Sequence, residues 1–335
     1  INKSLNTSSN RLKKMQIDIK KGFTVYKTEG NCVVACPHAG PALERSTSRD
    51  DNSETVGSIL WRLLGGKLII GNLSRGRILG IDFNRDIPNI KTAISMYDKV
   101  SEKEVSDKDE FYEYRKKYAW VAQDEKDYET RLKIYQNFWA EVESGSTVIL
   151  MHRQFNRLKS LPGIMDFIEL QKKKEDVVKA IEKVNSKYAP FMKKVDKPYK
   201  QAVLYETERM IANVIKKYNT FDLRLLGKEQ KYIFARDLKI AAKYCKPYIL
   251  DRLRESMTPQ NYLKAAKSAL ENCPYPRVTF QNTFNGEMAH GPRRKMLGMK
   301  DKFVIEVEGS HFINLWYPEV TASIIKDFIE ILNKK

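Results

Sequence analysis

The sequence predicts an α/β fold with a mixed central sheet flanked by helices and a large helical insertion. Short apolar runs typical of buried strands lie towards both ends of the chain. Between Pro162 and Asn272 the apolar residues instead recur with helical spacing almost throughout. We therefore expect residues 1–160 and 273–335 to form one α/β domain and residues 161–272 to form the helical insertion.

The predicted strands are short apolar or alternating runs bounded by turn residues. They cover residues 23–29, 32–37, 67–73, 77–83, 147–151, 277–284 and 302–308. A helix is predicted over residues 53–64, with Ser53 as its N-cap and Gly65-Gly66 as its stop.

The polar segment 107–143 carries spaced aromatic residues, which predicts helices that pack on the sheet. Residues 321–332 form the closing amphipathic helix. The helices of the insertion are expected to be divided by the prolines Pro190, Pro198, Pro247 and Pro259.

The amino-acid composition limits which classes of protein this chain can belong to. The chain has 335 residues, of which 42% are hydrophobic, enough to bury a core. It has no run of 18 apolar residues, so no membrane span is expected. The first residues contain no apolar signal core, from which we expect a cytoplasmic protein. Cys32 and Cys36 lie along a predicted buried strand and are interpreted as core residues rather than as a zinc knuckle or a disulfide.

The net charge of +18 is concentrated in the middle of the chain. From Arg153 to Pro276 there are 27 Lys and Arg residues against 14 Asp and Glu residues. A basic face can bind nucleic acid, steer an anionic substrate, or be a Lys-rich exposed surface of the kind found in heat-adapted proteins. The lysines are spread along the helices with no interleaved aromatic stacking pattern, which favours the last account.

The stretch from Cys32 to Glu44 places two possible metal ligands together. An apolar strand ends at Pro37, and His38 follows it directly. Open α/β sheets bind their ligands at this end of the strands. Glu44 lies in the same Gly- and Pro-containing loop, and imidazole with carboxylate is typical of catalytic zinc sites. A loop histidine with a solvated glutamate is the alternative.

Three later motifs extend this pattern, namely Ile81-Asp82-Phe83-Asn84-Arg85-Asp86, Val148-Ile149-Leu150-Met151-His152 and Phe303-Val304-Ile305-Glu306-Val307-Glu308. In this order after Pro37-His38-Ala39-Gly40, they resemble the N-formylglutamate amidohydrolase family, which is related in fold to zinc carboxypeptidases and aspartoacylase-like deacylases. The resemblance covers the N-terminal third, the strand at His152 and the C-terminal part. It does not cover the helical middle.

The resemblance implies a zinc ion held by a His, an acidic residue and a His. His38, Glu44 and His152 would then leave a fourth position for water, whose pKa the metal lowers. Asp51 and Glu54 are alternatives to Glu44 as the acidic ligand.

The resemblance also assigns a carboxylate-binding pair to Asn84 and Arg85, because a guanidinium group binds a carboxylate through two hydrogen bonds. Alternatively, Arg85 pairs with Asp82 or Asp86 for structure alone. Asp82 is also a candidate to orient a zinc-bound histidine.

Glu306 is the predicted general base, since a charged residue in an apolar strand is costly unless it has a task or a partner. Glu308 lies on the same face and is the alternative. His290 and Arg293 lie in a loop that is predicted to close over the substrate, or else to be a solvated basic loop. His311 is expected to cap structure rather than to bind metal.

These expectations converge on a metal-dependent amidohydrolase that cleaves an N-acyl amino acid, possibly N-formyl, or a similar small anionic amide. The alternative is a nucleic-acid-binding protein that uses the basic helical surface on a degenerate hydrolase fold. A scaffold without an active site is the third hypothesis. The oligomeric state is not predicted.

Overall fold

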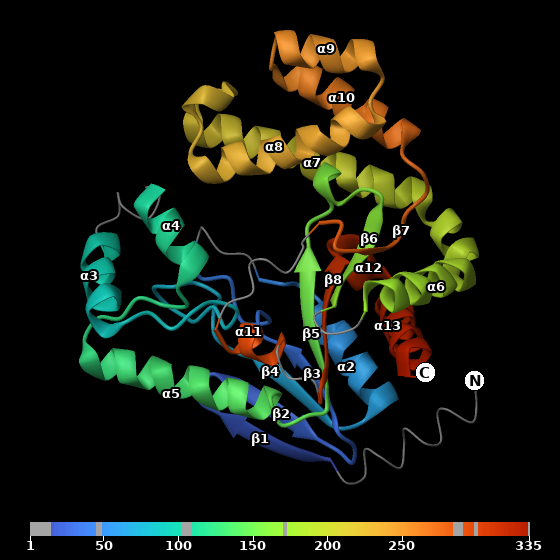
Figure 1. Cartoon of the computed structure of the whole chain (residues 1–335). Helices are drawn as coiled ribbons and strands as arrows, with labels where there is room; N and C mark the ends of the chain where they lie inside the picture. The colour runs from blue at the N-terminus through green and yellow to red at the C-terminus, as the bar shows by residue number, and fades with distance from the viewer. Residues whose placement is uncertain are drawn as a thin grey trace.

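The central sheet has eight strands in the order β1-β2-β4-β3-β5-β8-β6-β7 in a computed structural model (Figure 1), which describes residues 15–44, 49–101, 109–169, 173–283, 291–297 and 301–333. The predicted α/β class, with a mixed sheet flanked by helices, is confirmed. The strands are β1 (Gln16–Lys20), β2 (Phe23–Lys27), β3 (Cys32–Cys36), β4 (Lys67–Gly71), β5 (Thr147–Gln154), β6 (Gly163–Glu169), β7 (Arg277–Phe280) and β8 (Phe303–Ser310).

The middle of the sheet is parallel. Strands β4, β3, β5 and β8 run in one direction, while β2 and β6 flank them antiparallel. The carboxyl ends of β3, β5 and β8 therefore meet at one edge of the sheet, where open α/β sheets build their binding sites.

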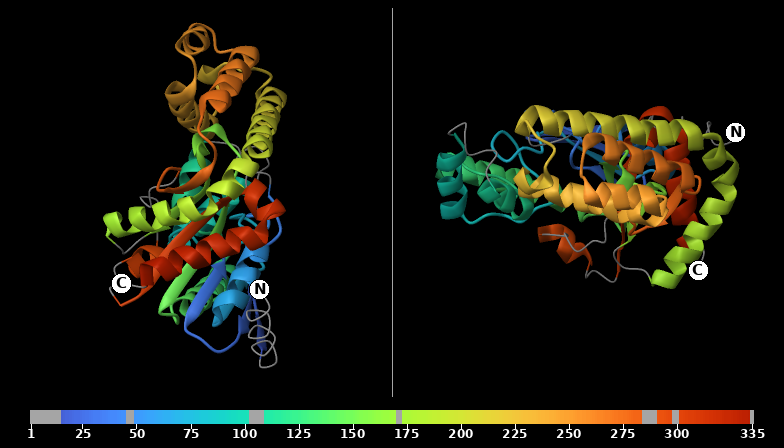
Figure 2. Two further views of the ribbon diagram at one scale, coloured as in Figure 1. Left: turned by 90° about the vertical axis from the view of Figure 1, so that its right-hand side faces the viewer. Right: turned by 90° about the horizontal axis from the view of Figure 1, so that it is seen from above.

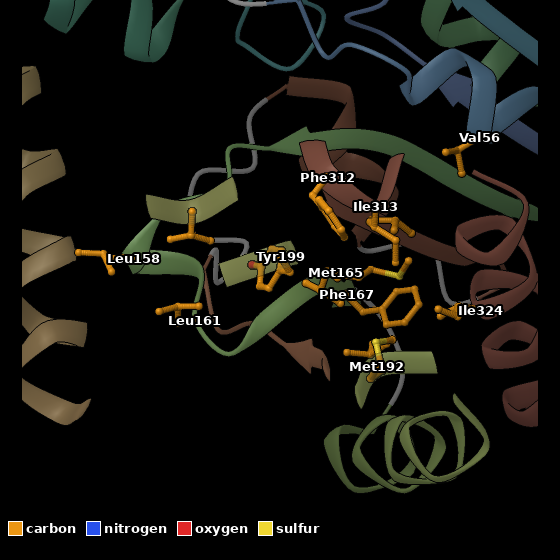
Figure 3. Packing of buried hydrophobic residues seen from close by; sticks show 14 of the residues in the cluster. Val56, Leu158, Leu161, Met165, Phe167, Met192, Tyr199, Phe312, Ile313 and Ile324 are labelled. Carbon is orange, nitrogen blue, oxygen red and sulfur yellow. The ribbon is translucent and has the colours of Figure 1, made fainter. Parts of the chain in front are cut away.

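Apolar side chains alternate between the two faces of the central strands. Val34 and Ile149 belong to the core on one face, and Val33 and Val148 belong to the core on the other. The first face is covered by α2 (Ser53–Leu64), α6 (Lys174–Lys194) and α13 (Pro318–Asn333). Figure 3 shows part of this core, including Phe167 from β6 and Ile324 from α13.

The second face is covered mainly by α5 (Glu125–Val142), with Met296 of α11 (Gly291–Leu297) in the same core. Two more helices on this side are α3 (Ile90–Ser101) and α4 (Asp109–Lys117). The short α12 (His311–Trp316) connects β8 to α13.

The other helices form a lobe over the carboxyl ends of the strands (Figures 1 and 2). This lobe contains α7 (Asp196–Tyr218), η2 (Leu223–Leu225), α8 (Lys228–Tyr244), α9 (Pro247–Glu255) and α10 (Pro259–Asn272). Helix α8 packs on η1 (Leu158–Ser160), which follows β5, and also reaches α4. The insertion therefore extends across the end of the sheet that carries His38 and His152.

Some predicted elements are wrong. Residues 77–83 form a loop rather than a strand, because Arg131 donates to the carbonyls of Ile78 and Gly80 at 2.9 and 2.7 Å in place of a neighbouring strand. Residues 163–169 form β6, not a helix, so the helical segment begins at α6. The apolar run in β6 is too short for its periodicity to separate strand from helix.

The helix predicted over residues 53–64 has those bounds and stops at Gly65, but its N-cap is Asn52 rather than Ser53. Pro190 lies inside α6 instead of ending it, whereas Pro247 and Pro259 each begin a helix.

Cys36, Cys245 and Cys273 are buried, Cys32 is half-buried, and all four cysteines are free, as expected for small core residues. No helix within the described ranges is long and apolar enough to cross a membrane.

Candidate metal centre

His38 is fixed by close backbone packing just beyond β3. A Cβ atom at Gly40 would lie 2.0 Å from the carbonyl oxygen of Leu73, so only glycine lets the loop pass this close. The amide of Asp50 donates to the carbonyl of His38 at 3.0 Å. These contacts bring the histidine and the aspartate to the same point although 12 residues separate them.

Asp50 lies between two imidazole rings. Its Oδ2 atom is 3.1 Å from Nδ1 of His38 and 2.9 Å from Nδ1 of His152. The ring centres of the histidines are 4.9 Å apart, and all three side chains are buried. Within the described residues, these three offer ligand atoms that lie within 4.8 Å of one another and can hold a metal ion. The predicted convergence of His38 and His152 is confirmed.

Glu44 is not the acidic member of this cluster. Its Oε1 atom accepts hydrogen bonds from the amides of Ile78 and Leu79 at 2.8 and 2.7 Å, which holds it in the neighbouring loop. The prediction that Glu44 is the carboxylate beside the two histidines is therefore wrong, and Asp50 lies there instead.

The two alternatives to Glu44 do not join the cluster either. Asp51 is about half exposed and faces Arg153 at 3.5 Å, and Glu54 pairs with Arg49.

Each histidine has a polar residue behind its outer nitrogen. Asp82 Oδ1 lies 3.0 Å from Nε2 of His38, as expected for a residue that orients a ligand. Asn84 Nδ2 lies 3.0 Å from Nε2 of His152, while its buried Oδ1 has no hydrogen-bond partner among the described residues.

The orphaned oxygen of Asn84 provides a test of whether this site fits a metal. An amide group keeps its shape when its nitrogen and oxygen exchange places. Turning the Asn84 amide in this way gives Oδ1 a proton to accept from Nε2 of His152, and Nδ1 of that ring then keeps its lone pair for a cation. Both rings then present Nδ1 beside Asp50, which is the pattern of a metal site with oriented ligands.

Two arginines that sequence reasoning missed balance the acidic groups. Arg77 Nη2 is 2.7 Å from Asp82 Oδ2, and Arg75 Nε is 3.2 Å from the same oxygen. Arg75 Nη1 is also 3.7 Å from Asp50 Oδ1. The Arg77 side chain is 6% exposed, whereas that of Arg75 is 27% exposed and therefore remains accessible to a ligand.

Both aspartates are held in their ionised form. Burial by itself would raise the pKa of Asp50, but its contacts with His152 and His38 and the charge of Arg75 hold that pKa well below its usual range. Burial also acts to raise the pKa of Asp82, and the charges of Arg77 and Arg75 outweigh it. An ionised carboxylate between two imidazoles is a suitable ligand set for a divalent cation.

Glu308 is nearer to this centre than Glu306. In the parallel pairing of β5 with β8, His152 is directly opposite Glu308, while Glu306 is opposite Leu150. Both glutamates are buried and lie on the same face of the sheet as His152. Burial raises the pKa of Glu308 to about 8, and the nearby Glu306 carboxylate adds to that rise while His152 opposes it. The register favours Glu308, the alternative, over the predicted Glu306 as the proton-transfer group.

Arg85 follows Asn84 directly in the chain. It is half-buried in the loop after residue 83, where its Nη1 donates to the Asn84 carbonyl at 3.3 Å. Asp82 forms ion pairs with Arg75 and Arg77.

His290 lies outside the described residues, and Arg293 is in α11 with its side chain outside them. His311 is the first residue of α12, whose N-cap is Ser310 rather than His311, and its Nδ1 lies 3.4 Å from Oε1 of Glu206.

The missed residues carried weak signals in the sequence. Asp50 stands immediately before Asp51, and the Arg75 and Arg77 pair precedes the Asp82 motif. Nothing local distinguishes a buried member of such a pair from an exposed one. Comparison with protein-family models, curated proteins and solved structures gives no match, so the chemistry of this centre rests on its geometry alone.

Proposed function

We propose that this protein is a metal-dependent hydrolase that cleaves a linear amide. The observation that carries the proposal is the buried His38, Asp50 and His152 cluster with Glu308 opposite His152 on the next strand. Two imidazoles and one carboxylate make a three-residue ligand set, which is the number that catalytic zinc sites use while keeping a position open.

His38, Asp50 and His152 would hold the metal, and Asp82 and Asn84 would orient the two rings. When bound, a divalent metal supplies Lewis-acid activation of the scissile carbonyl and of a water molecule. Zinc is the metal we expect, because nitrogen ligands together with a carboxylate suit it.

Glu308 is the residue to which we assign proton transfer. Hydrolysis of an amide requires a base that accepts a proton from the attacking water and an acid that gives one to the leaving nitrogen. Glu308 is buried beside His152, and its carboxylate oxygens can perform both steps in turn. Glu306, two residues earlier on β8, raises the proton affinity of Glu308 through the repulsion between two carboxylates.

Arg75 is the second group that we assign to the reaction. It reaches both Asp50 and Asp82 and keeps more than a quarter of its side chain accessible. A guanidinium in this position can stabilise negative charge that develops on the carbonyl oxygen. Arg85 keeps the role of binding the substrate carboxylate that the sequence predicts for it, whereas Asn84 supports His152.

The substrate we propose is an N-acyl amino acid or a similar amide that bears a carboxylate. The resemblance of the four motifs to the N-formylglutamate amidohydrolase family supports this class, and the arginines around the cluster support an anionic substrate.

Metal analysis joined to a substrate panel tests the proposal. The purified protein is expected to hold about one zinc per chain. A chelator should remove hydrolysis of N-formyl and N-acetyl amino acids, and added zinc should restore it. N-acyl amines without a carboxylate should be poorer substrates. Chelator-resistant hydrolysis, or an absence of bound metal together with inactivity on every amide, would contradict the proposal.

A further inference from the structure

The segment that follows β5 exposes an aromatic ring between two arginines. Phe155 is 38% exposed, although it comes just after a buried strand. The guanidinium carbons of Arg153 and Arg157 lie 4.3 and 5.4 Å from the centre of its ring. This ring lies three residues after His152, so it stands close to the candidate metal centre rather than on a remote surface.

Two further ring and guanidinium pairs lie on the helices of the insertion. On α7, Tyr205 is 60% exposed and Arg209 lies 5.8 Å from its ring centre. On α8, Tyr232 is 55% exposed and Arg236 lies 5.5 Å from its ring centre. In each pair the arginine follows the tyrosine by one helical turn, so both side chains lie on one helix face.

The pair on α7 is tied directly to the segment after β5. Glu206, next to Tyr205, accepts a hydrogen bond from Asn156 Nδ2 at 2.7 Å. Asn156 in turn is the neighbour of Phe155. The rings of Tyr205 and Phe155 are therefore carried by adjoining residues of two contacting elements.

The pair on α8 is tied to the same segment by packing. Helix α8 packs on η1, and Arg157 lines a cavity of about 170 Å³ together with Ile233 and Phe234 of α8. The three pairs therefore lie in residues 155–160 or on helices that contact them, although they are far apart in the sequence.

Positive charge is concentrated at the same place. Burial lowers the pKa of Lys159 to about 8, and the charges of Arg157 and Arg236 contribute to this shift. The buried Asp237 carboxylate counteracts this positive charge. It accepts hydrogen bonds from the Lys159 amide at 2.9 Å and from the Tyr262 hydroxyl at 3.0 Å. Cations held this close together bind a polyanion well, because its charge relieves their repulsion.

We infer that the surface formed by Phe155, Tyr205 and Tyr232 with Arg157, Arg209, Arg236 and Lys159 binds single-stranded nucleic acid. Unpaired bases stack on exposed rings, and arginines beside those rings contact phosphates and add cation–π attraction. A duplex hides the faces of its bases, so these rings would not contribute to its binding. The excess of 13 positive charges in the insertion and its flanks supplies the long-range attraction.

This inference extends the proposed function without depending on it, because binding needs no hydrolysis.

The test is fluorescence anisotropy of the full chain with a labelled 12-nucleotide oligo-dT or oligo-U, with and without chelator. Single strands should bind at least about 10-fold tighter than the matching duplex. The variant Phe155→Ala with Tyr232→Ala should weaken single-strand binding about 10-fold or more while leaving the salt dependence nearly unchanged, because no charge is removed.

Tyr248→Ala is the matched control, because Tyr248 is 58% exposed on α9, at the far end of the lobe (Figure 1). It should bind the single strand like the unaltered protein. Arg157→Gln with Arg236→Gln should instead lower the slope of log Kd against log salt by about 0.7 for each phosphate that is no longer neutralised.

Three outcomes would overturn the inference. They are equal binding of single strand and duplex, equal binding by the ring variant and the Tyr248 control, and binding of anionic phosphatidylserine vesicles without binding of the oligonucleotide. Circular dichroism of each variant separates loss of binding from loss of fold.

Discussion

Charge is organised differently at the metal centre and on the helical insertion. At the centre, a few charged residues are buried and each has named partners within hydrogen-bond reach, as Asp50 has with two histidines. On the insertion, most lysines are exposed, and those that form ion pairs do so at the surface, as Lys187 does with Asp327.

This difference determines what a single substitution can do. A buried charge that loses its partner keeps its full desolvation cost, whereas an exposed one regains water. A single substitution at the candidate metal centre should therefore be enough to abolish its function. On the insertion, a measurable effect should require the removal of several charges or of one of its few buried polar groups.

The strongest test of the contrast is Asp50→Asn against Glu44→Gln. Asp50→Asn removes the carboxylate charge that lies between the two imidazoles. Bound metal and hydrolysis should both be lost, with about 3–5 kcal/mol less free energy of unfolding. Glu44→Gln should keep the metal and cost about 1–3 kcal/mol, because its hydrogen bonds from two backbone amides weaken. Metal content by mass spectrometry and urea unfolding measure both. Metal loss in the Glu44 variant alone would reverse the assignment.

The second-largest expected effect is on kcat, and it distinguishes Glu308 from Glu306. Glu308→Gln should keep the metal and the fold and reduce kcat by roughly 10²–10⁴, the usual contribution of general acid–base catalysis. Glu306→Gln should reduce kcat less, because Glu306 is opposite Leu150 rather than His152. Steady-state kinetics on the zinc-loaded variants measures this. A larger loss in the Glu306 variant would return the role to Glu306.

A smaller effect is expected for Asn84, which contacts His152 on the side of the ring away from the candidate metal. Asn84→Ala removes the partner of His152 Nε2 without removing a ligand. Metal affinity should weaken about 10–100-fold. Competition with a fluorescent chelator measures the affinity, and Lys239→Ala on the exposed side of α8 serves as the control. Unchanged affinity would mean that Asn84 does not orient the ring.

The insertion has its own sensitive point at Asp237. Asp237→Ala leaves the Lys159 amide and the Tyr262 hydroxyl without their acceptor and should cost about 1–3 kcal/mol of unfolding free energy. Lys239→Ala, two residues away and exposed, should change it by less than about 0.5 kcal/mol. Thermal unfolding compares the two. Similar losses of stability in the two variants would show that burial does not determine which residues of the insertion tolerate substitution.

The smallest effect concerns a partly exposed cluster at the other end of the sheet. Burial acts to raise the pKa of Glu141, but hydrogen bonds from Lys20 and Lys67 outweigh it and lower the pKa to about 2. The Glu141 carboxyl therefore has a lower pKa in the folded protein than in the unfolded chain, where it is about 4.3. Its ionised form stabilises the fold above that pH, and this stabilisation is lost as the pH falls towards about 2.

Glu141→Gln should therefore cost about 1 kcal/mol at pH ~7, discounted for solvent screening, and almost nothing at pH ~2. Urea unfolding of both proteins across this range measures the difference. A difference that persists at the acidic end would show that packing rather than charge is involved.

The fold class and part of the centre follow from the sequence for a local reason. Apolar runs such as Val33 to Cys36 and Val148 to Met151 alternate between two cores, and a histidine follows shortly after each run. Strand placement therefore predicted that His38 and His152 would meet. The same reasoning failed over residues 77–83, where an arginine from a helix 51 residues away satisfies a carbonyl that a strand would otherwise pair.

The sequence by itself determined the α/β class, the placement of the two histidines towards the carboxyl ends of β3 and β5, and the excess of positive charge between residues 153 and 276. Only the tertiary structure decided that Asp50 rather than Glu44 is the acidic partner and that Glu308 lies opposite His152. It also brought α7 and α8, each with an exposed tyrosine, into contact with the segment after β5. The physical reason is distance along the chain, because Asp50 and His152 are 102 residues apart and only packing brings them together.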